Sequence, residues 1–300
     1  MHLAQQIQTL FELPQLQLEH LDIPVNDVVK IITPSAIFAL KIYNTGSRTL
    51  QDVQWELDLT EHLVKHGAPV VRPVRGKHGY VETLTVEGQA RAAALFEWLP
   101  GAKPQPSHQI YTALGEAAAR IHTAADSFKP PWTRDTYDAT RLIDEQIQRM
   151  KRHLVEADRY DNMMMLSARL QTYIADPKLN QGFCHMDLTL DNVHQHNGAL
   201  TVFDFDSSGW SWRAIEAWGV LRFSDEYFHD WLQGYRTVRP FSAHDESAVA
   251  AFGIVGDIRN IVWKLGEARS SRGKPQLTAA DLPTIVDGWL AWEQEKILHK

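Results

Sequence analysis

The alternation of hydrophobic and polar residues changes character along this chain. Residues 28–33 and 36–43 are two short, apolar and β-branched runs separated by a Pro-Ser pair. Residues 80–86 and 90–98 form a second pair of such runs around a Glu-Gly turn. Runs of this length and composition, bounded by turn residues, are typical of strands joined as hairpins. The first hundred residues are therefore predicted to contain an antiparallel sheet.

A helical pattern appears first between the two predicted hairpins. From Ser47 onward the apolar residues Leu50, Val53 and Leu57 recur at helical spacing. Gly67 is a typical C-terminal stop for such a helix. The pattern predicts one helix within the otherwise strand-rich first part of the chain.

Beyond residue 100 the pattern is mainly helical. Ser107 is a suitable N-cap for a helix that runs to about Ala124. Residues 99–106, which are rich in proline, are predicted to be a hinge or linker. Further helices are expected at about residues 138–157, 161–175, 213–235, 243–270 and 279–297. We therefore expect a β-rich N-terminal domain with an N-terminal helix at residues 1–98, the linker at 99–106, and a helical domain at 107–300.

One segment of the helical part departs from this pattern. Residues 182–206 contain two strand-like runs on either side of Asn197-Gly198, a strong signal for a two-residue hairpin turn. The sequence before the hairpin carries the motif His-x-Asp-x-x-x-x-Asn, and the strand after it ends in Asp-Phe-Asp. Acids and an amide at this spacing are typical of kinases, in which they hold Mg·ATP and orient a hydroxyl group toward the γ-phosphate. The spacing predicts phosphoryl transfer.

Each polar residue of these motifs suits a separate task. Asp187 can accept a hydrogen bond from an acceptor hydroxyl and take its proton late in the transfer. Asn192 and Asp204 offer the oxygen ligands that Mg²⁺ prefers. Asp206 is either a second metal ligand or an acid that caps the loop, and His185 is expected to brace the loop by hydrogen bonds. The alternative is a chance set of turn residues, and the second motif at the right distance argues against it.

With these motifs the chain resembles the aminoglycoside phosphotransferase/choline kinase family of kinase-like enzymes, including its type II homoserine kinases. The resemblance runs from about residue 36 to 270 and includes residues 114–122, 203–214 and 234–236. It implies an α+β, bilobal protein-kinase-like fold. In such a fold a small antiparallel-sheet N-lobe binds the nucleotide, and a larger, mainly helical C-lobe carries the catalytic and metal-binding loops.

The resemblance also implies roles for residues that carry little signal alone. Lys41 matches the strand lysine that contacts the α- and β-phosphates, and Glu56 matches the helix acid that pairs with it. Glu97, Trp98 and Leu99 fall where the interlobe hinge of the family offers backbone groups to adenine. Taken singly, Lys41 would be an edge-strand charge and Glu56 a solvated helix residue.

The chain departs from the kinase pattern at several positions. Residues 23–35 contain no glycine, so the Gly-rich phosphate loop of protein kinases is missing. Met186 stands where the family commonly has Gly or Asn, and Thr189 replaces the lysine that protein kinases place there. Glu216 occupies the position of an Asp that braces the catalytic loop. None of these changes removes a catalytic group, and together they favour a small-molecule substrate over a protein.

Aromatic and metal-binding side chains offer two further interpretations. Trp210 and Trp212 follow Asp206 closely, and aromatic rings can cage an ammonium group through cation–π contacts. Packing in the core is the alternative role for these tryptophans. Cys184, together with His185, His194 and His196, makes a poor zinc set, because strand neighbours point to opposite faces.

Composition limits the partners and the compartment. The net charge is −7 at pH 7 and no basic stretch is present, so nucleic acid is not an expected partner. The single cysteine fits a reducing compartment. The N-terminus lacks a signal-peptide pattern, and no apolar run approaches the roughly 20 residues that span a bilayer. We therefore expect a cytoplasmic protein without a membrane partner.

Three functions agree with these observations. The favoured one is an ATP- and Mg²⁺-dependent phosphotransferase acting on a hydroxyl group of a small metabolite, such as an amino alcohol, a hydroxy amino acid, a sugar or an aminoglycoside. The second is a bacterial stress-type Ser/Thr protein kinase. The third is a kinase-like regulator that binds nucleotide without transfer. The sequence does not identify the acceptor.

Overall fold

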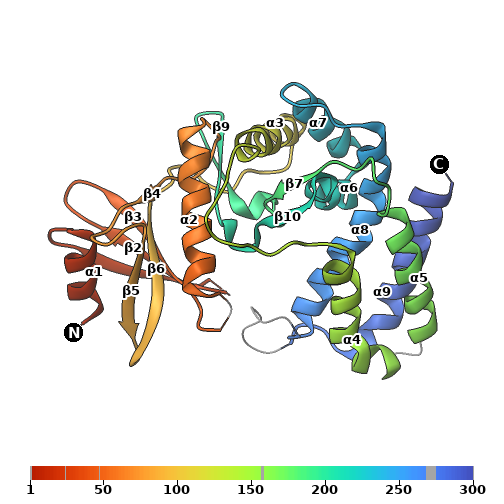
Figure 1. Ribbon diagram of the computed structural model, residues 1–300, viewed down its shortest axis with the longest axis horizontal. Helices are drawn as coiled ribbons and strands as arrows, with labels where there is room; N and C mark the ends of the chain where they lie inside the picture. The colour runs from red at the N-terminus through yellow and green to blue at the C-terminus, as the bar shows by residue number, and fades with distance from the viewer. Residues whose placement is uncertain (1, 24, 47, 157–158, 268–274, 300) are drawn as a thin grey trace. The chain divides into compact units, whose positions relative to one another are not determined.

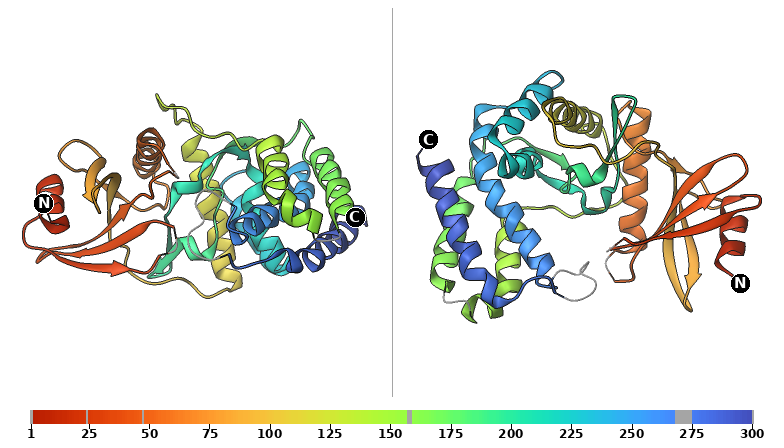
Figure 2. Two further views of the ribbon diagram at one scale, coloured as in Figure 1. Left: turned by 90° about the horizontal axis from the view of Figure 1, so that it is seen from below. Right: turned by 180° about the vertical axis from the view of Figure 1, so that it is seen from behind.

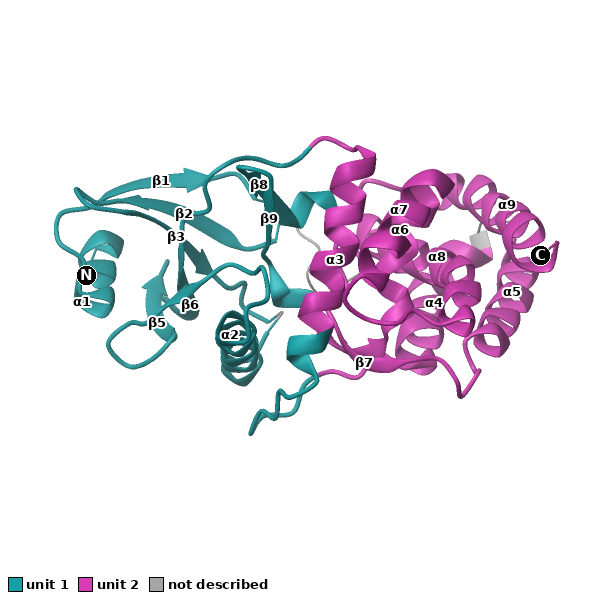
Figure 3. Ribbon diagram, turned by 90° about the horizontal axis from the view of Figure 1, so that it is seen from above, with its two compact units in different colours: residues 1–104, 123–134, 190–207 teal, residues 105–122, 135–189, 208–300 magenta. Residues whose placement is uncertain are grey.

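A computed structural model of the chain describes residues 2–23, 25–46, 48–156, 159–267 and 275–299. Ser47, residue 157 and residues 268–270, which the sequence predicts to be helical, lie outside the described residues. The chain divides into two compact units (Figure 3). Unit 1 comprises Met1–Pro104, Thr123–Arg134 and Leu190–Ser207, and unit 2 comprises Gln105–His122, Asp135–Thr189 and Ser208–Lys300. The domain boundaries expected from the sequence stay a prediction.

The main sheet of unit 1 is antiparallel throughout (Figure 1). Its strands run in the spatial order β1-β2-β3-β6-β4, and β5 also pairs with β6. The two hairpins predicted from the sequence are β2–β3 and β5–β6. The strands are β1 (Gln17–Leu21), β2 (Asp27–Ile32), β3 (Ile37–Ile42), β4 (Pro73–Val74), β5 (Val81–Val86) and β6 (Gln89–Glu97).

Two helices cover the two faces of this sheet. Helix α1 (Leu3–Phe11) packs on an apolar cluster that contains Leu40 and Leu95. Helix α2 (Leu50–Lys65) packs on a second cluster that contains Tyr43 and Phe96. Because side chains alternate between the faces of a strand, Lys41, which follows Leu40, points to the face that α2 covers.

A second, smaller hairpin of unit 1 lies between the two sequence motifs. Strands β8 (Val193–His196) and β9 (Ala199–Val202) pair antiparallel, as predicted. Both turn residues have positive φ, 50° at Asn197 and 81° at Gly198, as a type I′ turn requires. Short 3₁₀ segments flank the hairpin, η2 (Leu190–Asn192) before it and η3 (Phe205–Ser207) after it.

Unit 2 is mainly helical, and its later helices run side by side (Figure 2). One antiparallel strand pair, β7 (Gln181–Cys184) with β10 (Gly209–Trp212), lies within it. The α-helices are α3 (His108–Ala125), α4 (Glu145–Glu156), α5 (Tyr160–Tyr173), α6 (Trp218–Phe223), α7 (Asp225–Arg236), α8 (Ala243–Lys264) and α9 (Leu282–Glu293). Shorter helical segments are η1 (Thr140–Asp144), η4 (Arg213–Ala217), η5 (Ala279–Asp281) and η6 (Gln294–Leu298).

The helix predicted at residues 213–235 is wrong as a single element. The segment consists of a 3₁₀ turn and two α-helices, with a break at Ser224. Ser224 has an extended backbone, with φ −163° and ψ 133°, and its hydroxyl accepts the Tyr227 N–H at 3.3 Å. Ser224 is therefore an N-cap that starts a new helix, although the apolar residues on both sides continue at helical spacing.

Two glycines let α3 and α7 approach closely. A Cβ atom on Gly115 would lie 2.0 Å from the Trp231 carbonyl oxygen, and one on Gly234 would lie 1.9 Å from the Thr112 oxygen. The same crossing brings His122 Nδ1 within 2.8 Å of the Tyr235 hydroxyl. Residues 114–122 and 234–236, which carry part of the family resemblance, thus meet in one helix contact.

Candidate active site

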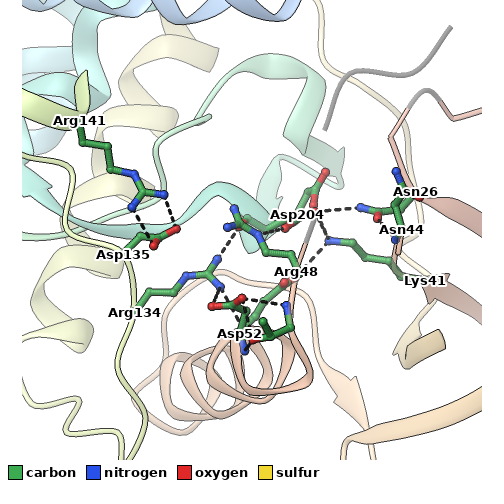
Figure 4. A network of polar contacts seen from close by, with 12 residues as sticks. Asn26, Lys41, Asn44, Arg48, Asp52, Arg134, Asp135, Arg141 and Asp204 are labelled. Atoms are coloured by element: carbon green, nitrogen blue, oxygen red, sulfur yellow. Dashed lines mark hydrogen bonds and ion pairs between the residues drawn. The ribbon is translucent and has the colours of Figure 1, made fainter. Parts of the chain in front are cut away.

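The predicted phosphate-binding lysine belongs to a charged cluster in unit 1, and Figure 4 shows its ammonium group directed at Asp204. Lys41 Nζ lies 3.2 Å from Glu56 Oε1 on α2 and 2.8 Å from Asp204 Oδ1. The Asp206 carboxylate is 3.7 Å away. Burial alone would lower the pKa of Lys41, but Asp204 and Glu56 outweigh this effect and hold it well above the usual value. The lysine is therefore a fixed positive charge.

Asp206 is the most firmly held acid of this cluster. Its carboxylate accepts hydrogen bonds from Arg48 Nε at 2.8 Å and from Asn26 Nδ2 at 2.9 Å. Its backbone oxygen accepts from Arg48 at 2.6 Å and from Arg134 at 2.5 Å. Burial acts to raise the pKa of Asp206, but Lys41 and Arg48 hold it below its usual range. Asp206 is thus ionised and anchored.

Asp204 differs from Asp206 in both exposure and backbone. Its side chain is 43% exposed, against 15% for Asp206. Its φ of 64° lies in the left-handed region, which is costly for a residue with a Cβ. A partly exposed carboxylate on a strained backbone, held by Lys41, suits a group that must point at a ligand.

Asn192 lies in the same unit, on η2. Its side chain is buried, and its backbone oxygen accepts the Phe203 N–H at 3.0 Å. This bond ties Asn192 to the residue directly before Asp204. The amide and carboxylate oxygens predicted to bind metal therefore belong to one small region, and hard oxygen donors of this kind fit Mg²⁺.

The predicted hinge residues lie at the end of β6 and just after it. The Glu97 N–H donates to the Arg72 oxygen at 3.0 Å, and the Trp98 N–H donates to the Ile37 oxygen at 3.2 Å. Leu99 packs against the apolar cluster on the α2 face of the sheet, as does Phe203. The hinge thus borders an apolar region that also contacts the residue before Asp204.

The loop that carries the predicted catalytic acid belongs to unit 2. His185 and Met186 are buried, whereas Asp187 is exposed. Met186 has a φ of 69°, so it too adopts the left-handed backbone, at the position where the resemblance implies Gly or Asn. His185 and Met186 are therefore buried residues that support the loop, and the side chain of Asp187 is exposed.

Met186 is held from both sides by charged side chains. Its N–H donates to Glu216 Oε1 at 2.9 Å, and its carbonyl oxygen accepts from Arg259 Nη1 at 3.1 Å. Burial raises the pKa of Glu216 to about 7, although the N–H groups of Met186 and His185 partly offset this rise. Glu216 occupies the bracing position that the family resemblance implies, and its contact with the loop agrees with that role.

The two candidate substrate tryptophans lie differently on β10. Trp210 is half-buried, and its backbone joins Asp135 and Tyr137, with N–O distances of 3.1 and 2.7 Å. Trp212 is buried, and its ring centroid lies 5.8 Å from that of Phe252. Trp210 therefore offers more accessible surface than Trp212, and a substrate role for either stays a prediction.

Cys184 lies in a buried part of unit 2 with His122 and Glu216. Potential ligand atoms of these three residues lie within 4.8 Å of one another. Burial raises the pKa of the Cys184 thiol and lowers that of His122, so both are neutral at pH 7. A neutral, buried thiol agrees with the sequence interpretation of Cys184 as a small core residue.

Several residues of the site carried no signal in the sequence. Arg48 and Arg134 hold Asp206 from positions 158 and 72 residues away, and Asn26 holds it from 180 residues away. Arg259 reaches Met186 across 73 residues. No fixed spacing links such residues to the motifs, so only the folded chain reveals them.

Comparisons with known proteins identify the family. The chain matches the model of the phosphotransferase enzyme family over residues 25–245. An uncharacterized protein of Deinococcus radiodurans is 30% identical over 248 residues, which cover 76% of this chain and 71% of the relative. A homoserine kinase of Methylobacillus glycogenes is 28% identical over 246 residues, which cover 75% of this chain and 72% of the relative. A solved structure of an amicoumacin kinase in complex with AMP-PNP, Ca²⁺ and Ami has a TM-score of 0.77 at 20% identity, over 98% of this chain and 93% of that chain.

The chain therefore belongs to the phosphotransferase enzyme family. This confirms the resemblance and the enzyme class predicted from the motifs, a kinase-type phosphotransferase. The predicted fold, with an antiparallel-sheet N-terminal part and a helical remainder, is confirmed as well. Among the described residues, no helix is both long and apolar enough to cross a bilayer.

Proposed function

We propose that this protein is an ATP- and Mg²⁺-dependent kinase that transfers the γ-phosphate to a hydroxyl group of a small metabolite. The observation that carries this proposal is the buried Lys41, ion-paired with Glu56 and Asp204 in one cluster. A lysine, an acid on a helix that pairs with it, and an acid that binds the metal are the recurring parts of kinase phosphate sites. The amicoumacin kinase of the same fold was solved with AMP-PNP, which supports a nucleoside triphosphate as the donor.

The phosphate-binding roles fall to unit 1. Lys41 binds the α- and β-phosphates, and its ion pair with Glu56 keeps the lysine in place. Asp204 and Asn192 would hold Mg²⁺, and Asp206, already bound by Arg48, is the weaker candidate ligand. The metal, when bound, neutralises charge on the phosphate oxygens. Glu97, Trp98 and Leu99 bind the adenine through backbone groups other than the Glu97 and Trp98 N–H groups, which donate to Arg72 and Ile37.

The acceptor role falls to Asp187 of unit 2. Its exposed carboxylate accepts a hydrogen bond from the acceptor hydroxyl and orients the oxygen for attack on the γ-phosphorus. The new P–O bond forms as the bond to the ADP oxygen breaks, and the hydroxyl proton passes to Asp187 late in the step. His185 braces the loop from its buried position.

Relatives of the chain support a small hydroxylated acceptor. A homoserine kinase, by its name, acts on an amino acid with a primary hydroxyl, and amicoumacin kinase acts on an antibiotic. Thr189, at the position of a protein-kinase lysine, also argues against a protein acceptor. The proposal therefore covers amino alcohols, hydroxy amino acids, sugars and aminoglycosides.

The test is phosphate transfer from Mg·ATP into a panel of hydroxyl metabolites, aminoglycosides and a generic protein, followed by mass spectrometry. We expect a phosphorylated small molecule, and at least about a 100-fold loss of rate with Asp187→Asn. Asp191→Asn is the control, because Asp191 is an exposed acid of the neighbouring η2 segment and pairs with Lys103. Phosphate found only on the protein would overturn the proposal and identify the chain as a protein kinase. Nucleotide binding without any transfer would replace it by a regulator.

A further inference from the structure

Arg259 of α8 lies directly beside the predicted catalytic acid. Its Nη1 atom donates to the Met186 carbonyl oxygen at 3.1 Å. The carbon of that carbonyl is bonded to the Asp187 nitrogen, so the guanidinium rests on the peptide that leads into Asp187. Arg259 is half-buried, and a part of its side chain faces solvent, as Asp187 does.

The charge of Arg259 is not held in a direct ion pair with any described carboxylate. Among the described residues, no carboxylate oxygen lies within 4.0 Å of its guanidinium. Two other arginines of unit 2 are paired with carboxylates: Arg141 lies 2.7 Å from Asp135, and Arg222 lies 2.6 Å from Asp257. A guanidinium has five N–H donors, and the Met186 carbonyl uses one of them.

The groups around Arg259 leave this positive charge in place. Its guanidinium carbon lies 5.4 Å from the Tyr137 ring centroid, and the Arg141 guanidinium carbon lies 4.9 Å from the same centroid. Glu216 is a nearby acid whose pKa the Arg259 charge lowers slightly, but its carboxylate accepts the Met186 N–H and does not pair with Arg259. Burial raises the pKa of Glu216 to about 7, so this acid is a weak counter-charge at neutral pH.

We propose that Arg259 binds a carboxylate group of the acceptor, and that the acceptor is a small hydroxy acid or hydroxy amino acid. This inference rests on the proposed function and narrows its acceptor class. The hydroxyl group hydrogen-bonds to Asp187 while the carboxylate takes the remaining N–H donors of Arg259. Arg–carboxylate pairs are frequently bidentate and directional. Arg259 therefore holds the carboxylate end of the acceptor while Asp187, on the other side of the Met186–Asp187 peptide, holds its hydroxyl end.

The test uses pairs of acceptors that differ only by a carboxylate. L-homoserine is compared with 3-amino-1-propanol, and L-serine with ethanolamine, in steady-state kinetics of the wild type and of Arg259→Gln. Gln keeps an N–H donor for the Met186 carbonyl but removes the charge. We expect the wild type to prefer the carboxylates. The variant should raise their KM roughly 10- to 100-fold, with kcat and the rates of the amino alcohols nearly unchanged.

Arg236→Gln is the matched control. Arg236 also donates to a backbone oxygen, that of Phe241, at 3.1 Å, but it is paired with Glu246 at 2.5 Å. We expect this variant to behave as the wild type with all four acceptors. Equal losses for both members of each pair in Arg259→Gln would assign Arg259 to loop support alone. Equal use of both members by the wild type would also overturn the inference.

Calorimetric binding of the same four compounds separates this inference from the proposed function. Binding of L-homoserine that depends on Arg259, without transfer to any hydroxyl compound, would overturn the kinase proposal and leave the carboxylate site standing. Transfer to 3-amino-1-propanol and L-homoserine, with equal binding of each compound by wild type and Arg259→Gln, would leave the kinase proposal standing and overturn the carboxylate site.

Discussion

Replacement of Glu216 by Gln tests whether this buried acid holds a proton in the folded protein. Glu216 is 4% exposed, and its Oε1 accepts the Met186 N–H at 2.9 Å. Burial raises its pKa from 4.5 to about 7. Gln has the same shape and also offers an oxygen to the Met186 N–H, but it cannot titrate. The two proteins should therefore differ in how their stability depends on pH.

The sign follows from proton binding in the two states. Between pH 4.5 and 7 the folded chain keeps the Glu216 proton while the unfolded chain releases it. The free energy of unfolding therefore falls as pH rises through this window. A shift from 4.5 to about 7, at 1.36 kcal/mol per pKa unit, amounts to about 3 kcal/mol. The contribution is fully present below pH 4.5 and lost above pH 7.

The assay is urea unfolding of the wild type and Glu216→Gln at pH 5 and pH 8. We expect the wild type to lose roughly 2–3 kcal/mol relative to the variant between the two pH values. Glu293→Gln is the control, because the Arg169 and Tyr173 hydrogen bonds lower the pKa of this buried acid. Its stabilising contribution is present above the unfolded pKa and lost as pH falls. Parallel pH profiles of wild type and Glu216→Gln would refute a raised pKa at Glu216.

Three further predictions concern packing, the charged cluster and the metal. Gly115→Ala should lower the free energy of unfolding by about 1–3 kcal/mol or more, because its Cβ would lie 2.0 Å from the Trp231 oxygen. Gly288→Ala, which has nothing within 4 Å, should be neutral or gain up to about 1 kcal/mol in the same denaturation assay. Lys41→Met should leave the buried Glu56 unpaired, destabilise the protein by about 3–5 kcal/mol and abolish ATP binding in a titration; unchanged affinity would contradict the assigned role. EDTA should stop phosphate transfer, and added Mg²⁺ should restore it; activity that persists in EDTA would exclude the metal dependence.

Local signals predicted much of the secondary structure. The runs at residues 28–33 and 36–43 became β2 and β3, and the Asn197-Gly198 turn became the β8–β9 hairpin. In both cases the turn and its two strands are consecutive in the sequence, at residues 27–42 and 193–202, so the short-range pattern contains the information that decides the pairing. Strand β1 and the strand pair of β7 with β10 were not predicted, because their pairing depends on partners elsewhere in the chain.

The residues of the candidate site also fall into those that the sequence named and those that only the fold placed there. The sequence motif named Asp204, the family resemblance named Lys41 and Glu56, and the fold brings these three into one cluster, although 163 residues separate Lys41 from Asp204. Arg48, which holds Asp206, belongs to no motif. The catalytic, metal and nucleotide roles of all these residues stay predictions for the experiments above.

The chain by itself determined the identity of its reactive groups and the local elements that carry them. The motifs around Asp187 and Asp204, and the spacing of the apolar residues, are local properties that need no folded partner. Tertiary structure alone decided which side chains support those groups, namely Arg48 and Arg134 at Asp206 and Arg259 at Met186. Long-range contacts leave little trace in one sequence, because any surface arginine has the same local pattern until the fold places a carbonyl or a carboxylate in front of it.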